Sequence, residues 1–244
     1  MAPETFTPSF GEHAPFPVEP WLKRQPVEFQ RDFLALAVLE TFEAGEMVWP
    51  TGESLECMVG VIDGCIALGR SASYEPPALV GFCWNGDWAG EVEFVSGVAS
   101  FTSVEARTDA RLALIEYRKL TFLLDEKPKW WNCVAALEAR HALHSADTVM
   151  DLQIHDPTAR CVAVILRMIA GAMHPGAPAA PNILVPMSQV ELASLANLHR
   201  NSVGTILRKL AAEGLLINHY RAIEVIDPAG LQRRARSLLP VPER

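Results

Sequence analysis

The sequence predicts an α+β protein in which a β-rich N-terminal half, one long helix and a helical C-terminal part follow one another. Three observations predict this order. Short apolar runs separated by glycine turns fill the chain between Phe42 and Tyr117. A helical pattern of more than twenty residues follows near residue 130, and two short helix patterns lie between Met187 and Leu216. Runs of strands followed by runs of helices are typical of α+β folds.

The composition is that of an ordinary globular protein. The chain has 244 residues, of which 50% are hydrophobic and 20% are charged, enough for one large domain or two of ordinary size. No apolar run reaches the roughly 18 residues that indicate a membrane span. The N-terminus lacks the basic start and apolar centre of a signal peptide. We therefore expect a cytoplasmic protein with no membrane partner.

The five cysteines are scattered, with no C-x-x-C pair. This spacing argues against a zinc ribbon or a local metal cluster. We expect buried free thiols instead. They are Cys57, Cys65, Cys83, Cys133 and Cys161.

The net charge of −8 hides an asymmetry along the chain. Residues 1–156 hold 11 Lys and Arg against 24 Asp and Glu, a net charge of −13. Residues 157–236 hold 9 Lys and Arg against 4 Asp and Glu, a net charge of +5. A basic segment behind an acidic body indicates that the C-terminal part meets a polyanion.

The N-terminal half divides into an arm and a β-rich domain. Six prolines and no helical period mark the first 26 residues, so residues 1–29 are predicted to form an extended arm. Across residues 30–128, short strands at 8–12-residue spacing predict a small antiparallel barrel or sandwich. In "VIDGCIAL", Asp63-Gly64 between apolar halves predicts a hairpin, and "WNGDWAGE" repeats the turn chemistry.

Helices dominate from Leu120 onward. "RKLTFLLDEKP" predicts a short helix that stops before Pro128. A long helix is predicted within residues 129–155. A single long helix is too narrow to form a core alone, so this one is expected to pack along a partner helix. The C-terminal domain is predicted over residues 156–244. It begins with a helix at Pro157, followed by the loop "HPGAPAAP" and the short strand "NILVP".

The two short helices carry clear start, break and core signals. Ser188 and Glu191 form an S-x-x-E capping box. Asn197 stands at the break, where asparagine tolerates a left-handed backbone. Spacings of three, four and seven residues in the second helix predict a buried stripe of Val203, Ile206, Leu207 and Leu210.

The opposite face of the second helix is polar and free of acids. It carries Arg200, Asn201, Gly204, Thr205 and Arg208. Arginine can fork onto guanine, asparagine can reach adenine, a threonine methyl can touch thymine, and glycine lets the backbone come close. A purely structural helix pair also needs a polar outer face. The following "INHYRAIEVID" predicts a hairpin wing with Arg221 at its tip near phosphate, and the wing and the basic charge favour DNA binding.

These segments together resemble the Crp/Fnr superfamily of bacterial transcription regulators. "SQVELASLANLHRNSVGTILRKLAAEGLLI…IEVIDPAGL" is similar to that family's winged helix-turn-helix, and the turns of "FEAGEMVWPTGE", "VIDGCIAL" and "GDWAGEVEF" to its cyclic-nucleotide-binding-type β-roll. The resemblance covers about residues 30–232. It implies an N-terminal antiparallel, cupin-like β-roll, a dimerisation helix and a homodimer on near-palindromic double-stranded DNA. It also implies contact with RNA polymerase if the protein is an activator.

The resemblance also implies roles for individual residues. Arg200 matches the family's guanine-reading arginine. Asn201 falls where many members carry glutamate and Thr205 where many carry a second arginine, so the base preference should differ. Ser188, Gln189 and His199 match phosphate-contacting positions. The predicted DNA-binding set is Ser188, Gln189, His199, Arg200, Asn201, Ser202, Gly204, Thr205, Arg208 and Arg221.

An effector is harder to predict. In cyclic-nucleotide-binding members a Gly-Glu pair holds the ribose and an arginine about ten residues later pairs with the phosphate. Gly90-Glu91 is present, but Ser100 or Phe101 stands at the arginine position, and "VEFVSGVASFTSVEA" contains no Arg or Lys. A buried phosphate without a cation is costly. We therefore expect a structural turn at Gly90-Glu91 and an effector other than a cyclic nucleotide, or none. Ser145, where a base-contacting hydroxyl would stand, keeps cyclic AMP as an alternative.

Sensor chemistry and catalysis find little support. An iron–sulfur sensor needs clustered N-terminal cysteines, and a haem sensor could use only His13, His141 or His144 as a ligand. His141 and His144, one turn apart, could hold a metal, but packing or exposure at the dimer seam is favoured. The alternative from outside the transcription regulators is a metal-dependent cupin enzyme, since cupin barrels resemble the β-roll in sequence. Such enzymes usually show an H-x-H motif, which this chain lacks. No catalytic residue, metal or cofactor is predicted. Core filling is favoured over a ligand pocket for Trp84, Trp88, Trp130 and Trp131.

Overall fold

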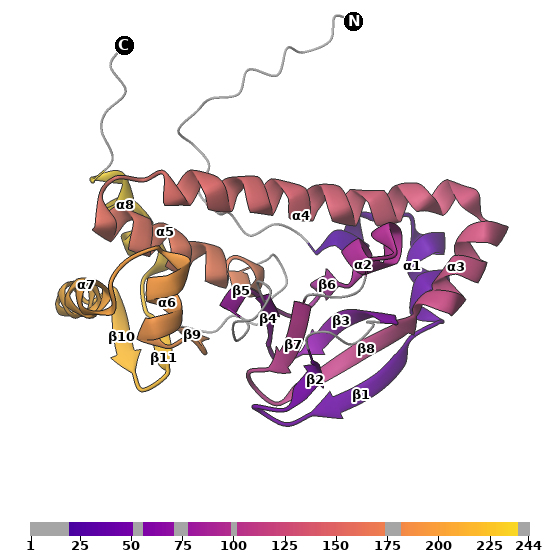
Figure 1. Cartoon of the computed structure of the whole chain (residues 1–244), viewed down its shortest axis with the longest axis horizontal. Helices are drawn as coiled ribbons and strands as arrows, with labels where there is room; N and C mark the ends of the chain where they lie inside the picture. The colour runs from indigo at the N-terminus through magenta and orange to yellow at the C-terminus, as the bar shows by residue number, and fades with distance from the viewer. Residues whose placement is uncertain (1–19, 51–55, 71–77, 99–101, 174–181, 239–244) are drawn as a thin grey trace, which may run out of the picture.

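The computed structural model describes residues 20–50, 56–70, 78–98, 102–173 and 182–238. One long helix, α4 (Trp131–Leu152), runs along one side of the molecule (Figure 1). The β-strands of the N-terminal half lie beneath one end of this helix, and the C-terminal helices and hairpin lie beneath the other (Figure 1). The predicted α+β order of β-roll, long helix and helical C-terminal domain is confirmed.

Residues 20–34 are folded rather than extended. They form the short helices η1 (Trp21–Arg24) and α1 (Val27–Leu34), each preceded by a proline. Trp21 is 2% exposed and its indole Nε1 donates a 2.8 Å hydrogen bond to the Cys133 carbonyl on α4. The predicted arm over residues 1–29 is therefore wrong for residues 20–29, because their aromatic side chains are buried in the domain. Residues 1–19 lie outside the described residues.

The β-roll consists of two four-stranded antiparallel sheets. The strand orders are β1-β8-β3-β6 and β2-β7-β4-β5. This arrangement confirms the predicted small antiparallel domain. The first sheet contains β1 (Val38–Phe42), β3 (Cys57–Asp63), β6 (Trp88–Ala89) and β8 (Ala110–Glu116); the second contains β2 (Met47–Trp49), β4 (Ile66–Arg70), β5 (Ala78–Cys83) and β7 (Thr102–Ala106).

The hairpin predicted at Asp63-Gly64 is wrong. A turn does occur there, with Gly64 at φ +91°, but β3 and β4 pair with strands of different sheets. The adjacent turn between β7 and β8 explains why β4 leaves the sheet of β3. The Cys65 amide donates to Thr108 Oγ1 (2.9 Å) in that turn, and the Cys65 carbonyl accepts from the Arg107 amide (2.8 Å). Both turns cross between the sheets side by side, so the glycine turn changes sheet instead of closing a hairpin.

The helices on either side of the long helix α4 follow the predicted order. The short helix α3 (Tyr117–Glu126) ends before Pro128, and α5 (Pro157–Ile169) begins at Pro157. The Asp156 carboxylate caps α5 by accepting a 2.8 Å hydrogen bond from the Ala159 amide. The shorter helices are α2 (Glu91–Ser96), η2 (Pro128–Trp130) and η3 (Gly171–Met173).

Aromatic side chains fill the space between α1, α4 and the first sheet. Trp88 and Trp130 are each 3% exposed, and the Phe33 and Trp88 ring centres lie 4.8 Å apart. Core filling is thus confirmed for these two tryptophans. Trp84 instead donates a 2.8 Å hydrogen bond from Nε1 to the Met168 carbonyl on α5, and Trp131 stacks on Phe94 while remaining 39% exposed.

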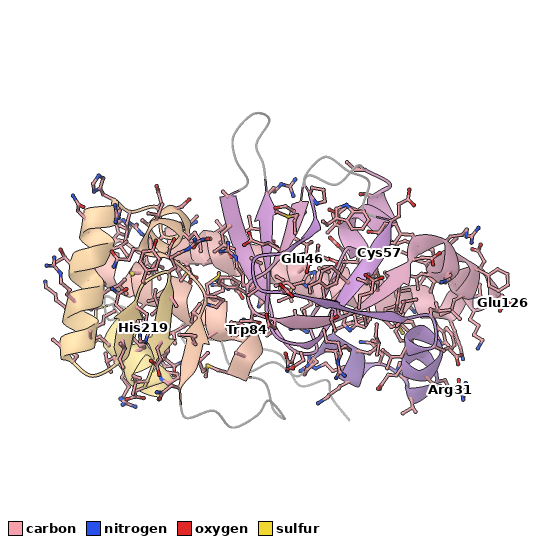
Figure 2. All side chains as sticks on the ribbon, turned by 90° about the horizontal axis from the view of Figure 1, so that it is seen from below. Arg31, Glu46, Cys57, Trp84, Glu126 and His219 are labelled. Atoms are coloured by element: carbon pink, nitrogen blue, oxygen red, sulfur yellow. The ribbon has the colours of Figure 1, made fainter. Side chains whose placement is uncertain are left out.

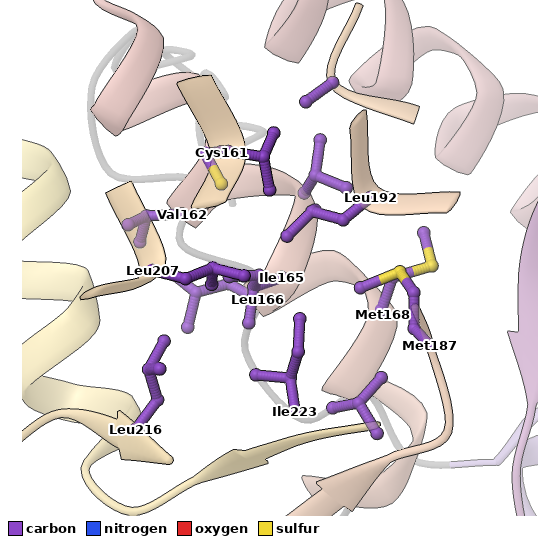
Figure 3. Packing of buried hydrophobic residues seen from close by; sticks show 14 of the residues in the cluster. Cys161, Val162, Ile165, Leu166, Met168, Met187, Leu192, Leu207, Leu216 and Ile223 are labelled. Atoms are coloured by element: carbon purple, nitrogen blue, oxygen red, sulfur yellow. The ribbon is translucent and has the colours of Figure 1, made fainter. Parts of the chain in front are cut away.

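The C-terminal domain packs three helices and a small sheet around α5. Leucine, isoleucine and methionine side chains from α5, α6, α7 and the sheet form one buried cluster (Figure 3). The last helix, α8, was not predicted from the sequence. The elements are β9 (Ile183–Val185), α6 (Gln189–Leu195), α7 (Arg200–Ala212), β10 (Leu216–His219), β11 (Ala222–Val225) and α8 (Pro228–Arg236).

Three further sequence predictions concern cysteines, metals and membranes. All five cysteines are buried and free, as predicted, and burial raises the pKa of the Cys57 thiol to about 11. Within the described parts of the chain, no cluster of three His, Cys, Asp or Glu side chains is arranged to hold a metal ion. Among the same residues, no helix is long and apolar enough to cross a membrane.

Candidate functional site

The first helix of the C-terminal pair begins with the predicted capping box. The Glu191 amide donates to Ser188 Oγ (3.2 Å), and the Ser188 amide donates to Glu191 Oε2 (2.7 Å). The Ser188 hydroxyl also donates to Glu191 Oε2 at 2.7 Å. The amide and the hydroxyl of Ser188 therefore both serve the start of α6 in the free protein.

The break between α6 and α7 has the predicted backbone. Asn197 adopts φ +48°, in the left-handed region, where asparagine is among the tolerated residues. His199 then caps α7, since its Nδ1 accepts a 3.3 Å hydrogen bond from the Asn201 amide. Nδ1 is thus engaged in the cap, and Nε2 is the ring nitrogen left to donate to a phosphate.

The second helix separates a buried stripe from an exposed polar face, as predicted. Val203, Ile206, Leu207 and Leu210 are at most 7% exposed. Arg200, Asn201 and Thr205 are exposed on the other side. No side chain among the described residues forms an ion pair with Arg200. Figure 2 shows α7 at the edge of the molecule farthest from the β-roll, with nitrogen-tipped side chains pointing outward.

Arg208 is not extended but folded along this polar face. Its Nε donates to the Gly204 carbonyl (3.2 Å) and its Nη2 to Thr205 Oγ1 (3.1 Å). Thr205 Oγ1 in turn donates to the Asn201 carbonyl at 3.1 Å. These contacts hold the guanidinium against the helix surface instead of leaving it free in solvent.

Gly204 lies where α6 and α7 approach closely. A Cβ atom built at Gly204 would lie 3.2 Å from Gln189 Oε1. The Gln189 side chain, from the first turn of α6, therefore packs over the polar face of α7. The structure brings together the predicted residues from the starts of both helices.

The wing is a two-stranded hairpin extended by β9. Strand β10 pairs with β11, which pairs with β9. Arg221 lies at the tip as predicted, at φ +59°, beside Tyr220, which is 93% exposed. Below the tip, His219 Nε2 and Glu224 Oε2 lie 2.7 Å apart (His219 is labelled in Figure 2). The pKa of the Glu224 carboxyl is lowered, mainly by the hydrogen bond with His219. Glu224 is thus held below the tip, where Asn182 also donates to it at 2.7 Å, and Arg221 is the charged residue at the tip itself.

In the β-roll, Gly90 forms the predicted turn, but Glu91 does more than close it. Gly90 adopts φ +100° at the start of α2, and the Tyr117 hydroxyl donates a 2.6 Å hydrogen bond to its carbonyl. Glu91 is 1% exposed, and its Oε1 lies 2.5 Å from His141 Nδ1 on α4. Its Oε2 is buried without a hydrogen-bond partner among the described residues. A buried carboxylate thus connects the β-roll to the long helix.

The other residues predicted for an effector pocket make no such contact between the β-roll and α4 among the described residues. The Ser145 hydroxyl donates back to the His141 carbonyl of its own helix at 3.0 Å. Ser100 and Phe101 lie outside the described residues. Arg140 on α4 is paired with Asp87 at 3.0 Å. The contact between His141 and Glu91 was not predicted from the sequence. A histidine on a long helix does not by itself indicate a partner that lies 50 residues away.

The comparisons with known proteins agree with both halves of the molecule. Residues 39–127 match the sequence model described as a cyclic nucleotide-binding domain. Residues 159–234 match the model described as a Crp-like helix-turn-helix domain. A β-roll of the first kind joined by a long helix to a DNA-binding domain of the second kind defines a class of transcription regulators. The chain belongs to the Crp/Fnr superfamily of these regulators.

Individual relatives match over most of their length. The cAMP-activated global transcriptional regulator CRP of Escherichia coli is 24% identical over 79% of this chain and 91% of the relative. The CRP-like protein Clp of Xanthomonas axonopodis is 25% identical over 80% and 85%. The solved structure of the c-di-GMP-responsive global regulator Clp of Xanthomonas campestris has the same fold, with a TM-score of 0.63 and 21% identity. The structural match covers 82% of this chain and 99% of the Xanthomonas campestris chain.

Proposed function

We propose that this protein acts as a homodimer that recognises a near-palindromic operator through the exposed face of α7. The observation that carries the proposal is the acid-free polar face of α7, held outward by its buried stripe and followed by a basic wing tip. In this arrangement Arg200 and Asn201 contact bases. His199, Ser188, Gln189, Ser202 and Arg221 are proposed to contact the DNA backbone.

The surface of α4 supports a homodimer. Ala136, Ala139, Leu143, Ala146 and Met150 are exposed and follow one another at spacings of three and four residues. This is the spacing of the apolar seam in a two-stranded coiled coil. Leu143 is 69% and Met150 is 55% exposed in the single chain. Pairing of this seam with a second copy of α4 places two recognition helices on one DNA duplex.

Replacement of Arg200 tests the DNA-binding proposal. The preferred duplex of the full chain is first selected from random DNA, and binding of the Arg200→Ala variant is then measured. Loss of a bidentate guanine contact costs about 1–3 kcal/mol and relaxes the preference at one base pair. Lys209→Ala, on the same helix but about 40° beyond Thr205, is the matched control, and loss of its charge should leave the base preference unchanged. Unchanged specific affinity of Arg200→Ala contradicts the assignment.

The seam has its own test. Leu143→Glu places a charge on both sides of the interface and is expected to give a monomer in sedimentation measurements. The same change at exposed Phe122, on α3, is the control. A dimeric Leu143→Glu variant contradicts pairing through α4.

We further propose that the β-roll responds to a ligand other than a cyclic nucleotide, or to none. Glu91 and Glu93 oppose a phosphate, and the sequence between Val92 and Ala106 offers no cation. Cyclic AMP binding with a divergent pocket is the alternative, and Clp of Xanthomonas campestris is described as c-di-GMP responsive. Calorimetry with both nucleotides separates the cases. Micromolar binding of either, coupled to a change in DNA affinity, contradicts the proposal.

The remaining parts of the proposal follow from the DNA target. The protein acts in the cytoplasm, contacts RNA polymerase if it activates transcription, and is not an enzyme. A cupin-type enzyme requires stoichiometric metal, which elemental analysis of purified protein detects. The proposed domain limits are 30–128 for the β-roll, 129–155 for the dimer helix and 156–244 for the DNA-binding domain, with residues 20–29 added to the β-roll.

A further inference from the structure

The polar face of α7 contains a second arginine whose position differs from that of Arg200. At about 100° per residue, Arg208 lies about 80° around the helix from Arg200, between Gly204 at about 40° and Thr205 at about 140°. Arg208 therefore stands in the middle of the polar face. A helix inserted in the major groove contacts base edges with its N-terminal residues and with side chains that reach the groove floor, whereas other side chains meet the sugar–phosphate backbone.

The side chain of Arg208 is turned back toward the start of α7. Its hydrogen bonds to the Gly204 carbonyl and the Thr205 hydroxyl fix Nε and one N–H of Nη2. Arg208 starts about 12 Å further along the helix axis than Arg200, and these contacts return its guanidinium toward the level of residues 204 and 205. Gly204 itself has no side chain that could displace the guanidinium from the helix surface.

We infer that Arg208 reads a guanine in the major groove and that Thr205 is the residue that positions it. This inference rests on the proposed DNA-binding function. The two N–H groups of Nη1 and the second N–H of Nη2 remain for the O6 and N7 acceptors of guanine. No carboxylate of the described residues is paired with Arg208, so DNA does not have to displace one. A guanidinium already held in one orientation loses less conformational freedom on binding.

Thr205 contributes through its hydroxyl. The hydroxyl accepts from Arg208 Nη2 and donates to the Asn201 carbonyl, so both its accepting and its donating roles are in use. A valine at position 205 has nearly the same shape but cannot make either contact. Recognition of the base pair at this level of α7 thus depends on two side chains. Arg208 contacts the DNA, and Thr205 orients Arg208.

The test begins with selection of the preferred site by the full wild-type chain from random duplex DNA. Dissociation constants are then measured for this site and for its single-base-pair variants. Arg208→Ala is expected to weaken binding about ten- to a hundred-fold and to lose the preference at one guanine in each half-site. Arg208→Lys is expected to retain the salt dependence of wild type but lose that preference, since lysine lacks the fork. Thr205→Val is expected to weaken the same preference by a smaller factor.

The outcomes distinguish this inference from the function on which it rests. If Arg208→Ala weakens binding to all sequences by the same factor and Arg208→Lys restores it, Arg208 contacts phosphate and the inference is overturned. If wild type selects a specific site and the Arg208 variants keep the same preference at every base pair of it, the inference also fails. Sequence-specific binding by the protein then still stands. If wild type selects no sequence, the proposed function and this inference fail together. Thermal melting of each variant verifies that the exposed substitutions leave the fold intact.

Discussion

The guanidinium of Arg107 donates a 2.7 Å hydrogen bond to the carboxylate of Glu191, and this ion pair joins the β-roll to the helix pair. Arg107 lies in the turn between β7 and β8, and Glu191 lies in the first turn of α6. The two side chains are 15% and 24% exposed. A cavity of about 330 Å³ beside them is lined by both domains. Since Glu191 also closes the capping box, the same carboxylate starts α6 and anchors it to the β-roll.

Breaking this ion pair should uncouple the two domains. Arg107→Met removes the cation, and Glu191→Gln removes the charge while keeping an oxygen for the capping box. A double-mutant cycle measured by denaturant unfolding should give a coupling energy of about 1 kcal/mol, the upper range for partly exposed pairs. Glu191→Ala is the comparison, because it loses the cap as well and should cost about 1 kcal/mol more. A coupling energy near zero would show that the contact is incidental.

The same carboxyl makes the stability of the protein depend on pH. Burial, the largest influence, raises the pKa of Glu191, but hydrogen bonds from Ser188 and the charge of Arg107 outweigh it and leave the pKa below its ordinary value of 4.5. A carboxyl with a lower pKa in the folded state contributes stability above its unfolded pKa, and this contribution is lost as pH falls through the folded value. Wild type should therefore lose more stability than Glu191→Gln when unfolding is compared at pH 7 and below pH 4. Parallel losses in the two proteins contradict this linkage.

The sequence predicted the C-terminal domain better than the β-roll for a physical reason. The capping box, the left-handed Asn197 and the stripe from Val203 to Leu210 all depend on residues within a few positions of one another. Local hydrogen bonds and helical spacing therefore specify them. The ion pair of Arg107 with Glu191 joins residues 84 positions apart, and no local pattern indicates it.

Long-range packing also explains the two errors. Asp63-Gly64 has the chemistry of a hairpin turn, but contacts with the turn at Thr108 send β4 into the other sheet. Residues 20–29 show no strong helical period, but they fold because Trp21 is buried against α1 and α4 and Phe29 is buried against Trp21 and Trp130. The buried partnership of Glu91 with His141 was missed for the same reason. Each case depends on which distant segment supplies the partner.

Trp21 should be among the residues on which the β-roll depends most. Its indole is buried among Phe29, Phe33 and Trp88, with ring centres 5.5 to 6.5 Å away, and its N–H binds the Cys133 carbonyl. Trp21→Ala is expected to lower the free energy of unfolding by about 3–5 kcal/mol. Trp131→Ala, which removes a partly exposed indole, is the control and should cost much less. Equal losses for the two variants would contradict the packing role of residues 20–29.

Asn197 offers a test of the break between the two helices. Its φ of +48° lies in the region that favours glycine. Asn197→Ala places an unfavourable Cβ there without the polar side chain of asparagine, and should lower the free energy of unfolding by about 1 kcal/mol. Asn197→Gly removes the backbone strain and should leave stability unchanged or slightly higher. Both changes lie outside the polar face of α7. DNA affinity measured at a temperature where each variant is folded should therefore remain within about two-fold of wild type. An alanine variant as stable as the glycine variant would show that the left-handed backbone is not required at this position.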